Sequence, residues 1–590
     1  MSTNYTLNAA GGQGGPAREV TLRDGLKRFV PLMTGEGRAV TISLLAIFTS
    51  STATLFAPTI ISHGIDDYIR LKDGPGLLRQ TALLMGVFII GAIASYAQVR
   101  VMGAVGRRLL FRLRNALFTR LQELPAAFFN QNKAGDLISR LNNDTDKLNQ
   151  FISQALMQFM GNIFMMTGAA VFLLSLNLKL GAAALVPGVI VLAITSLTSS
   201  WVKARNLKSL QGLGGMSGEI QESLNNFKVI VAFNRVDYFR RKFETANLAN
   251  FAASTAAGYA NNLFIPLYGL AAMAAQLLVI AYGIRLIEAG EVTMGLLIGF
   301  LLYVGNFYFP LRQLASIWSS FQMGLAAIDR ISDVLVLESN MPQGPANTIE
   351  SNAVLSFRNV SFTYPGGTKV LHDATFDLER GKAYALVGPT GGGKTTTASL
   401  MARLYDPGQG GVYLNGRDIR SYAPEERAKK IGFILQDPFL FSGTVRENII
   451  YGNDEYKDCT TAQLAAILEE SGLSGLMERF SEGLETKVLA SGNSISLGQK
   501  QLIAFMRATL RKPELLILDE ATANIDTVTE QLLQEILAKL PRSTTKVIIA
   551  HRLNTIDNVD QIFFVNACEI VHAGSMEHAV DMLLHHKRAS

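Results

Sequence analysis

A glycine-rich run in the second half of the chain holds the residues with the clearest chemical purpose. It reads Gly388-Pro389-Thr390-Gly391-Gly392-Gly393-Lys394-Thr395-Thr396, directly after an apolar run at 383–387. Glycines let backbone amides wrap around phosphate oxygens, the lysine reaches the outer phosphates, and the hydroxyl of Thr395 can hold magnesium. The run therefore predicts a nucleoside triphosphate site.

Two adjacent carboxylates form a second candidate element. Asp519 and Glu520 follow the four apolar residues 515–518, which are typical of a fully buried strand. Such a strand would deliver Asp519 to the magnesium ion and Glu520 to a position where it polarises an attacking water. An Asp-Glu pair can also be an ordinary solvated strand end, but its place after the phosphate loop favours the catalytic interpretation.

The elements that position these residues belong to an α/β domain. From about residue 350, short Val/Ile/Leu runs alternate with amphipathic helical stretches. The phosphate loop requires a strand before it and a helix after it, and the sequence offers both. Cys459 and Cys568 fit neither a zinc site nor a disulfide framework, so we expect two reduced thiols.

The first half of the chain is a membrane domain by composition. The whole chain is 48% hydrophobic and only 17% charged. Six runs lack Asp, Glu, Lys and Arg over about the 18 residues or more that a bilayer requires. They are approximately 39–62, 80–99, 151–176, 180–201, 257–284 and 294–311. Buried helices of a large soluble protein are the alternative, which six such runs make unattractive. The fold class predicted is an all-α six-helix transmembrane domain followed by an α/β phosphate-loop ATPase domain.

The loops predict the orientation. The second-to-third and fourth-to-fifth connections are rich in Lys and Arg, whereas the first-to-second loop holds Asp66, Asp67 and Asp73. Basic loops stay in the cytoplasm, so both termini and the ATPase domain are expected on the cytoplasmic side of the inner membrane. The long connections are amphipathic, with leucines every four residues from Leu109 to Leu121, and are expected to extend the membrane helices.

The spans themselves offer no energy source. No ionisable residue lies in the middle of any of them, so a proton relay is not expected. Asn261, Asn262, Gln276 and Asn306 could line a pathway, but hydrogen bonds between helices are the favoured interpretation.

The expected domain boundaries are 1–30 for a flexible cytosolic tail, 31–335 for the membrane domain, 336–351 for a linker and 352–590 for the ATPase domain. The tail is rich in glycine and shows no secretory signal. The net charge of +6 could suggest nucleic acid, but the basic residues cluster beside hydrophobic segments, so a lipid bilayer and no nucleic acid is expected.

The run Ile495-Ser496-Leu497-Gly498-Gln499 is similar to the signature Leu-Ser-Gly-Gly-Gln of ABC transporters. Residues of about 352–580 resemble the nucleotide-binding domain of that family, and the fused order resembles its exporter half-transporters. The resemblance implies that Ser496, Leu497, Gly498 and Gln499 begin a helix whose N-terminus meets the terminal phosphate of ATP bound to a partner subunit.

Other roles follow from the same resemblance, residue by residue. Tyr364 looks like the aromatic that stacks on adenine, and Asp526 matches a loop that contacts the partner. Gln436 resembles a glutamine that touches magnesium and senses the membrane domain, and His551 a switch histidine beside the terminal phosphate. The resemblance implies Glu520, His551 and Gln436 as the catalytic set, with Thr395, Gln436 and Asp519 around Mg²⁺.

Two elements of the membrane half resemble the coupling helices of exporters. The first is at 124–129 and continues through 135–141, and the second lies within 219–233. In the family these elements carry motion from the ATP-binding domain to the membrane helices.

Two departures from the family pattern bear on the partner. Leu497 replaces the first signature glycine, and Ala490 replaces an upstream glutamate. Both changes occur in exporters that work as heterodimers, so homodimer and heterodimer both stay open. Glu520 and His551 are both present.

The expected function is ATP- and Mg²⁺-dependent export of a hydrophobic or amphipathic substrate, such as a lipid, drug or peptide, by a dimer. The alternative is a regulatory half of a heterodimer in which the partner site dominates hydrolysis. A soluble DNA-repair or translation ATPase conflicts with the six apolar runs, and importers usually keep the two domains on separate chains.

Overall fold

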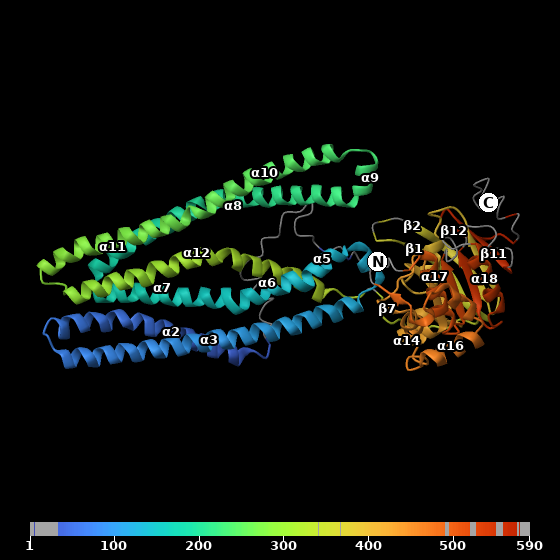
Figure 1. Ribbon diagram of the computed structural model, residues 1–590, viewed down its shortest axis with the longest axis horizontal. Coiled ribbons are helices and arrows are strands. Elements are labelled where there is room, and N and C mark those ends of the chain that lie inside the picture. The colour runs from blue at the N-terminus through green and yellow to red at the C-terminus, as the bar shows by residue number, and fades with distance from the viewer. Residues whose placement is uncertain are drawn as a thin grey trace. The chain divides into compact units, whose positions relative to one another are not determined.

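The computed structural model describes residues 5, 7, 34–339, 341–365, 367, 369–489, 495–519, 527–549, 559–574 and 578. Two compact units emerge (Figure 1). The helical unit comprises Leu7–Gln122 and Lys133–Leu337, and the ATPase unit comprises Met1–Thr6, Glu123–Asn132 and Glu338–Ser590.

Six helical stretches of 21 to 53 residues are long and apolar enough to cross a membrane, within the described residues. They confirm the six predicted spans. The helices of this unit are α2 (Gly37–His63), η2 (Gly64–Ile69), α3 (Gly74–Glu123), α5 (Ala134–Ser139), η3 (Arg140–Asp144), α6 (Thr145–Gln150), η4 (Phe151–Ala155), α7 (Leu156–Leu176), α8 (Leu178–Asn225), α9 (Phe227–Ala232), α10 (Val236–Asn262), α11 (Phe264–Glu288) and α12 (Met294–Val336).

The long connections are helical, as their leucine spacing predicts. α3 is one helix of 50 residues, about 75 Å long at 1.5 Å per residue. Leu109, Leu113 and Leu117 on its extension are buried. This leucine stripe packs against neighbouring helices, so the connections are ordered helical extensions rather than irregular loops.

Short polar contacts fix the ends of the apolar helices. Asn177 is the only residue between α7 and α8, and its side chain accepts a hydrogen bond from the Leu180 amide as the N-cap of α8. Asp66 accepts hydrogen bonds from the Thr293 hydroxyl at 2.5 Å and from the Gly295 amide at 3.0 Å. An acidic residue of η2 thus satisfies a free backbone amide at the start of α12.

Polar side chains within the helices pair across helix boundaries. Asn261 and Asn206 exchange hydrogen bonds of 2.9 and 3.1 Å between α10 and α8. This confirms the interhelical interpretation for Asn261. Tyr303 and Tyr308 of α12 donate to the carbonyl oxygens of Leu55 and Ala184, respectively.

The described residues of the ATPase unit form three sheets. One is antiparallel, in the order β2-β1-β4-β5; another has the order β12-β11-β3-β10-β9-β6, and the small third pairs β7 with β8. The strands are β1 (Ala353–Thr363), β2 (Lys369–Glu379), β3 (Ala383–Val387), β4 (Gln409–Leu414), β5 (Arg417–Asp418), β6 (Ile431–Ile434), β7 (Gly443–Thr444), β8 (Lys487–Val488), β9 (Leu515–Asp519), β10 (Thr545–Ile549), β11 (Gln561–Asn566) and β12 (Glu569–His572).

Helices complete this α/β unit, confirming the predicted fold class. They are α4 (Ala126–Gln131), α13 (Lys394–Met401), η5 (Ile419–Ser421), α14 (Pro424–Lys430), α15 (Val445–Ile450), α16 (Thr461–Glu470), η6 (Ser474–Arg479), η7 (Gly483–Glu485), α17 (Leu497–Thr509) and α18 (Thr527–Lys539). Cys459 and Cys568 are free thiols, as predicted.

The core of the six-stranded sheet positions the candidate site. β3, β6, β9 and β10 run parallel, and every residue of β3 and β9 is buried. β10 lies between β3 and β9, and β6 borders β9 on the other side. The carboxyl ends of these strands therefore share one edge, where ligands of open α/β sheets bind.

Candidate nucleotide site

The glycine-rich run is a loop between β3 and α13, as predicted. Gly388, Gly391 and Gly393 have φ angles of +146°, +82° and +112°, which glycine adopts without strain. A Cβ atom at Gly388 or Gly392 would collide with the carbonyl oxygen of Val565. The loop conformation therefore depends on its glycines.

Lys394 lies back over this loop. Its ammonium donates hydrogen bonds of 2.9 and 3.0 Å to the carbonyl oxygens of Gly388 and Pro389, and the residue is buried. It is also the first residue of α13, whose N-terminal amides carry partial positive charge. An ammonium and a helix N-terminus at one place form an anion site suited to phosphate.

Thr395 and Asp519 meet across the sheet edge. The Thr395 hydroxyl donates to Asp519 Oδ1 at 3.3 Å, and Asp519 is buried at the end of β9. A hydroxyl beside a carboxylate is a donor set that fits Mg²⁺, which prefers oxygen ligands and few protein carboxylates. Gln436 follows β6, the strand next to β9, and is exposed.

Three of the predicted residues, Glu520, Asp526 and His551, lie outside the described residues. The strand ends that precede two of them are described. Glu520 follows Asp519 in the chain, and β10 ends at Ile549, two residues before His551.

Tyr364 is half-buried and contacts the first turn of α13. Its hydroxyl lies 3.0 Å from the hydroxyl of Thr396, and its ring packs edge-on against Tyr405 at 5.4 Å and Phe362 at 4.9 Å. Burial raises the pKa of the Tyr364 phenol above its ordinary value. Adenine stacking by the Tyr364 ring stays a prediction. The contact between the Tyr364 and Thr396 hydroxyls could not be predicted from the sequence.

The signature run begins a helix, as the resemblance implies. Ser496 is the N-cap of α17, and its hydroxyl accepts from the Gln499 amide at 3.2 Å while Gln499 Oε1 accepts from the Ser496 amide at 2.9 Å. This reciprocal pair is a capping box. Gln499 also donates to the carbonyl oxygen of Arg479 at 2.6 Å. Leu497 occupies the first helical position with 38% of its surface exposed.

Residues 124–129 of the first predicted coupling element lead into and form α4, which packs within the ATPase unit, whereas residues 135–141 lie on α5 and η3 of the helical unit. Asn130 of α4 donates a 2.6 Å hydrogen bond to the Tyr405 hydroxyl. Sequence reasoning missed Tyr405, because a tyrosine after a helix carries no signature of its own. The second element is divided between the end of α8 and α9.

Tyr5 is a second residue that sequence reasoning missed. It lies in the tail expected to be flexible, yet it is 1% exposed and its ring contacts Phe128 edge-on at 6.2 Å. Its amide donates to Gln131 Oε1 at 2.8 Å, and its hydroxyl to the carbonyl oxygen of Glu338 at 3.1 Å. The only hint of this burial in the sequence was a single tyrosine among the mostly small and polar residues of the tail.

The parallel strands, the glycine loop, Lys394 and Asp519 together define a phosphate-loop ATPase unit in a chain that also carries six membrane spans. Comparison with known families makes this specific. Residues 40–311 match the family described as "ABC transporter transmembrane region", and residues 371–523 match "ABC transporter". The chain belongs to the ABC transporter family, as the resemblance predicted.

Its relatives share the fused arrangement. An "Uncharacterized ABC transporter ATP-binding protein YfiC" of Bacillus subtilis is 33% identical, covering 91% of this chain and 89% of the relative. A "Fatty acid ABC transporter ATP-binding/permease protein" of Mycobacterium tuberculosis is 31% identical, over 85% and 79% of the two chains. A "Multidrug resistance ABC transporter ATP-binding and permease protein" of Lactococcus lactis is 29% identical, over 93% and 92%.

The chain is therefore a membrane protein of the ABC exporter half-transporter family, with an ATPase coupled to transport. The predicted exporter family and the predicted transport-coupled ATPase are both confirmed by the two family matches within one chain.

Proposed function

We propose that this chain dimerises with a second half-transporter and uses ATP to export a hydrophobic or amphipathic substrate across the cytoplasmic membrane. The observation that carries the proposal is the joining of a phosphate loop, with Lys394 and the Thr395–Asp519 pair, to six apolar spans.

The proposed boundaries are a tail at 1–30, the membrane domain at 31–335, a linker at 336–351 and the ATPase domain at 352–590. Basic connections support cytoplasmic termini.

The residues divide the work of hydrolysis in this proposal. Lys394 and the loop amides bind the phosphates, and Thr395, Gln436 and Asp519 hold Mg²⁺. The ion, when bound, neutralises charge that builds up on the phosphate oxygens. Glu520 orients and polarises the attacking water, and His551 lies beside the terminal phosphate. Tyr364 stacks on adenine.

Dimerisation is supported by surfaces that are apolar and exposed on each unit of the single chain. Phe227 and Phe233 at α9 are exposed, and so are Phe439 and Tyr451 of the ATPase unit. The rings of Phe439 and Tyr451 both contact Phe441, and exposed apolar patches of this kind mark interaction surfaces. We propose that a second half-transporter covers both surfaces and that Ser496, Gly498 and the α17 N-terminus act on the partner's ATP, with Asp526 at the dimer contact.

The substrate class follows from the spans and the relatives. Uncharged helices favour a lipid, a drug or an amphipathic peptide over a small ion. Relatives named for fatty acids and for multidrug resistance agree with this range.

Replacement of Glu520 by Gln tests the proposal in the purified dimer, reconstituted in liposomes. A general base contributes about 10²- to 10⁴-fold, so we expect ATP hydrolysis and transport to fall by at least about 100-fold while ATP still binds. Glu535→Gln, an exposed glutamate on α18, is the matched control and should be neutral.

Survival of hydrolysis and transport in Glu520→Gln would instead favour the regulatory-half alternative. Exposed Leu497 at the start of α17 is the observation that keeps this alternative open, because its side chain stands beside the amides that would meet phosphate.

A further inference from the structure

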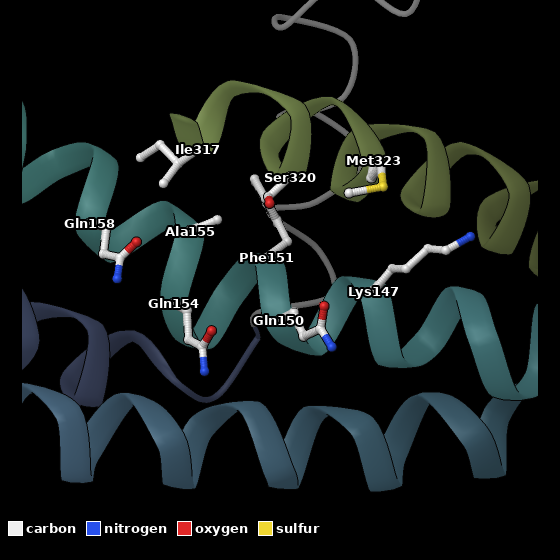
Figure 2. Close-up of a pocket in the computed structure, with 9 residues that line it drawn as sticks. All are labelled: Lys147, Gln150, Phe151, Gln154, Ala155, Gln158, Ile317, Ser320 and Met323. Carbon is white, nitrogen blue, oxygen red and sulfur yellow. The ribbon is translucent and has the colours of Figure 1, made fainter. Parts of the chain in front are cut away.

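A small polar cavity opens between the third helical stretch and the second half of α12, far along the chain from the phosphate loop. Its volume is about 90 Å³, and its walls come from α6, η4, α7 and α12 (Figure 2). A cavity of this size holds a few water-sized groups, whereas a whole drug-sized ligand needs roughly 300 Å³ or more. The cavity therefore fits the head of a ligand and leaves the rest outside.

One wall is a row of amides. Gln150, Gln154 and Gln158 line the cavity at intervals of four residues, and Figure 2 shows them one after another along a single helix, with Ser320 on the neighbouring helix. Over the part of the chain that the structure describes, no protein group hydrogen-bonds to these three side chains, which are exposed. Each amide has two N–H donors for an oxygen-rich ligand.

Lys147 adds a positive charge at the end of this row. Its ammonium lies 3.3 Å from Asp144 Oδ1, while its own side chain stays 45% exposed. An ammonium carries three N–H donors, so this one contact leaves donors that can turn toward the cavity that Lys147 lines.

Asp144, the partner of Lys147, is held in place by a network of ion pairs. Asp144, with 2% of its side chain exposed, also has Arg330 Nε 3.0 Å from Oδ2, an ion pair without hydrogen-bond alignment. Arg330 and Arg140 both pair with Asp136, at 2.6 and 2.8 Å. These five groups comprise three cations and two carboxylates. The side chains of Arg140 and Arg330 are 2% and 20% exposed, against 45% for Lys147, so the most accessible positive charge is at Lys147.

The local backbone explains why these groups meet. Two π-helical turns, η3 and η4, bracket α6 within an otherwise α-helical stretch. Such turns are rare and occur often at functional sites, because each wider turn redirects the side chains that follow. Here η3 carries Arg140 and Asp144 into the network, and η4 carries Gln154 to the cavity.

The apolar side of the site suits a hydrocarbon chain. The ring of Phe151, a cavity-lining residue, packs against Phe321 at 5.0 Å. At 100° per residue, Leu302 and Phe309 lie on the same face of α12 as Ser320, about 16 to 27 Å along the helix. Both are exposed.

We propose that this cavity binds the anionic head of a single-chain amphiphile, a carboxylate or a phosphate ester, while its tail lies along α12. Lys147 supplies the charge, and the glutamine amides donate to the remaining oxygens. This inference rests on the proposed export of an amphipathic substrate and names its chemistry: an anion with one alkyl tail.

Equilibrium binding to the full-length chain in nanodiscs, without nucleotide, tests the site. The probes are radiolabelled laurate, dodecyl phosphate and the neutral dodecanol. A hydrogen bond to a charged group contributes about 1.5–3 kcal/mol, so Lys147→Met should weaken binding of at least one anion by about 10- to 100-fold and leave dodecanol unchanged. The anion that responds identifies the head group.

Matched variants keep the result interpretable. Lys179→Met removes another exposed lysine that lies 3.3 Å from a carboxylate, Glu291, and should not change binding. Lys147→Arg should restore most of the affinity, and Gln154→Leu should lower it by about three- to tenfold, as loss of one hydrogen bond predicts.

Equal anion binding by wild type, Lys147→Met and Gln154→Leu would overturn the inference, as would equal losses in Lys147→Met and Lys179→Met. If Lys147→Met does not fold, the comparison of Gln154→Leu and Lys147→Arg with wild type provides the test. Because binding is measured without ATP, a failure of the proposed ATP-driven export, read from Glu520→Gln, stays distinguishable from a failure of this site.

Discussion

The side-chain amide of Asn130 donates a 2.6 Å hydrogen bond to the hydroxyl of Tyr405. The Tyr405 ring packs edge-on against Tyr364 at 5.4 Å, and the Tyr364 hydroxyl lies 3.0 Å from that of Thr396. Three successive contacts thus lead from α4, which the chain inserts between two membrane stretches, to the first turn of the phosphate-loop helix. They give the predicted coupling element a physical connection to the candidate nucleotide site.

We expect Asn130→Ala and Tyr405→Phe each to lower substrate-stimulated ATP hydrolysis by about two- to tenfold, since one hydrogen bond contributes about 0.5–1.5 kcal/mol. The double variant should be no worse than either single one, because both remove the same contact. Tyr413→Phe, in the same unit but outside this chain of contacts, is the control. Additive losses in the double variant would show that the two residues act separately.

Thr395→Ala should raise the Mg²⁺ concentration needed for half-maximal hydrolysis by about tenfold or more. The change removes the hydroxyl that lies 3.3 Å from Asp519 and that we propose as a metal ligand. Magnesium titration of the steady-state rate measures the effect, and Thr395→Ser should restore the wild-type value. An unchanged magnesium requirement in Thr395→Ala would remove Thr395 from the metal site.

Leu497→Gly should increase hydrolysis by about three- to tenfold in a homodimer. The substitution clears the side chain that stands at the start of α17, while the Ser496–Gln499 capping box stays in place. ATPase assays on the chain expressed alone, and on the chain with a candidate partner, measure it. If the hydrolysis rate of the chain expressed alone does not increase, its signature helix does not act on ATP bound to a second copy of the same chain.

The environment of Glu514 predicts that the free energy of unfolding falls at acid pH. Burial by itself would raise its pKa, but hydrogen bonds from Lys430 at 2.7 Å and Asn415 at 2.9 Å outweigh burial and hold the pKa below its ordinary value of 4.5. The folded chain then binds fewer protons than the unfolded one. This network therefore stabilises the fold above the ordinary pKa, and its contribution is lost as the pH falls through the lowered pKa.

Thermal unfolding of the full chain over about pH 6 to 3.5 checks this. We expect Glu514→Gln to lower the unfolding temperature near pH 6 and to show a smaller further drop on acidification than wild type. Glu469→Gln, an exposed glutamate on α16, serves as the control. Parallel acid profiles for wild type and Glu514→Gln would contradict the assignment.

Local patterns in the sequence predicted the elements well. The apolar run before Gly388 and the helix from Lys394 are present as expected, and Ser496 begins a helix. These features depend on neighbouring residues alone, since glycine, an N-cap serine and a buried apolar run each act within a few positions. The apolar runs at 151–176 and 180–201 leave residues 177–179 between them, but Asn177 alone separates the two helices, because its side chain caps α8 directly.

Other features had no local signal. The third stretch was expected as one apolar span from 151, yet its first five residues form the π-helical turn η4. Arg140 donates a hydrogen bond to the carbonyl oxygen of Arg330, which is 190 positions away on α12. The burial of Tyr5 depends likewise on Phe128 and Glu338, which no local pattern brings near it.

The sequence by itself determined the class of this protein: six uncharged spans, a phosphate loop and a signature helix, each written in contiguous residues. Only the tertiary structure decided which distant side chains meet, such as Thr395 with Asp519, Asn130 with Tyr405, and Lys147 with the end of a buried ion network. The physical reason is that helix and strand signals act over a few residues, whereas the neighbours of a strand end or a helix face are chosen by packing across the whole unit.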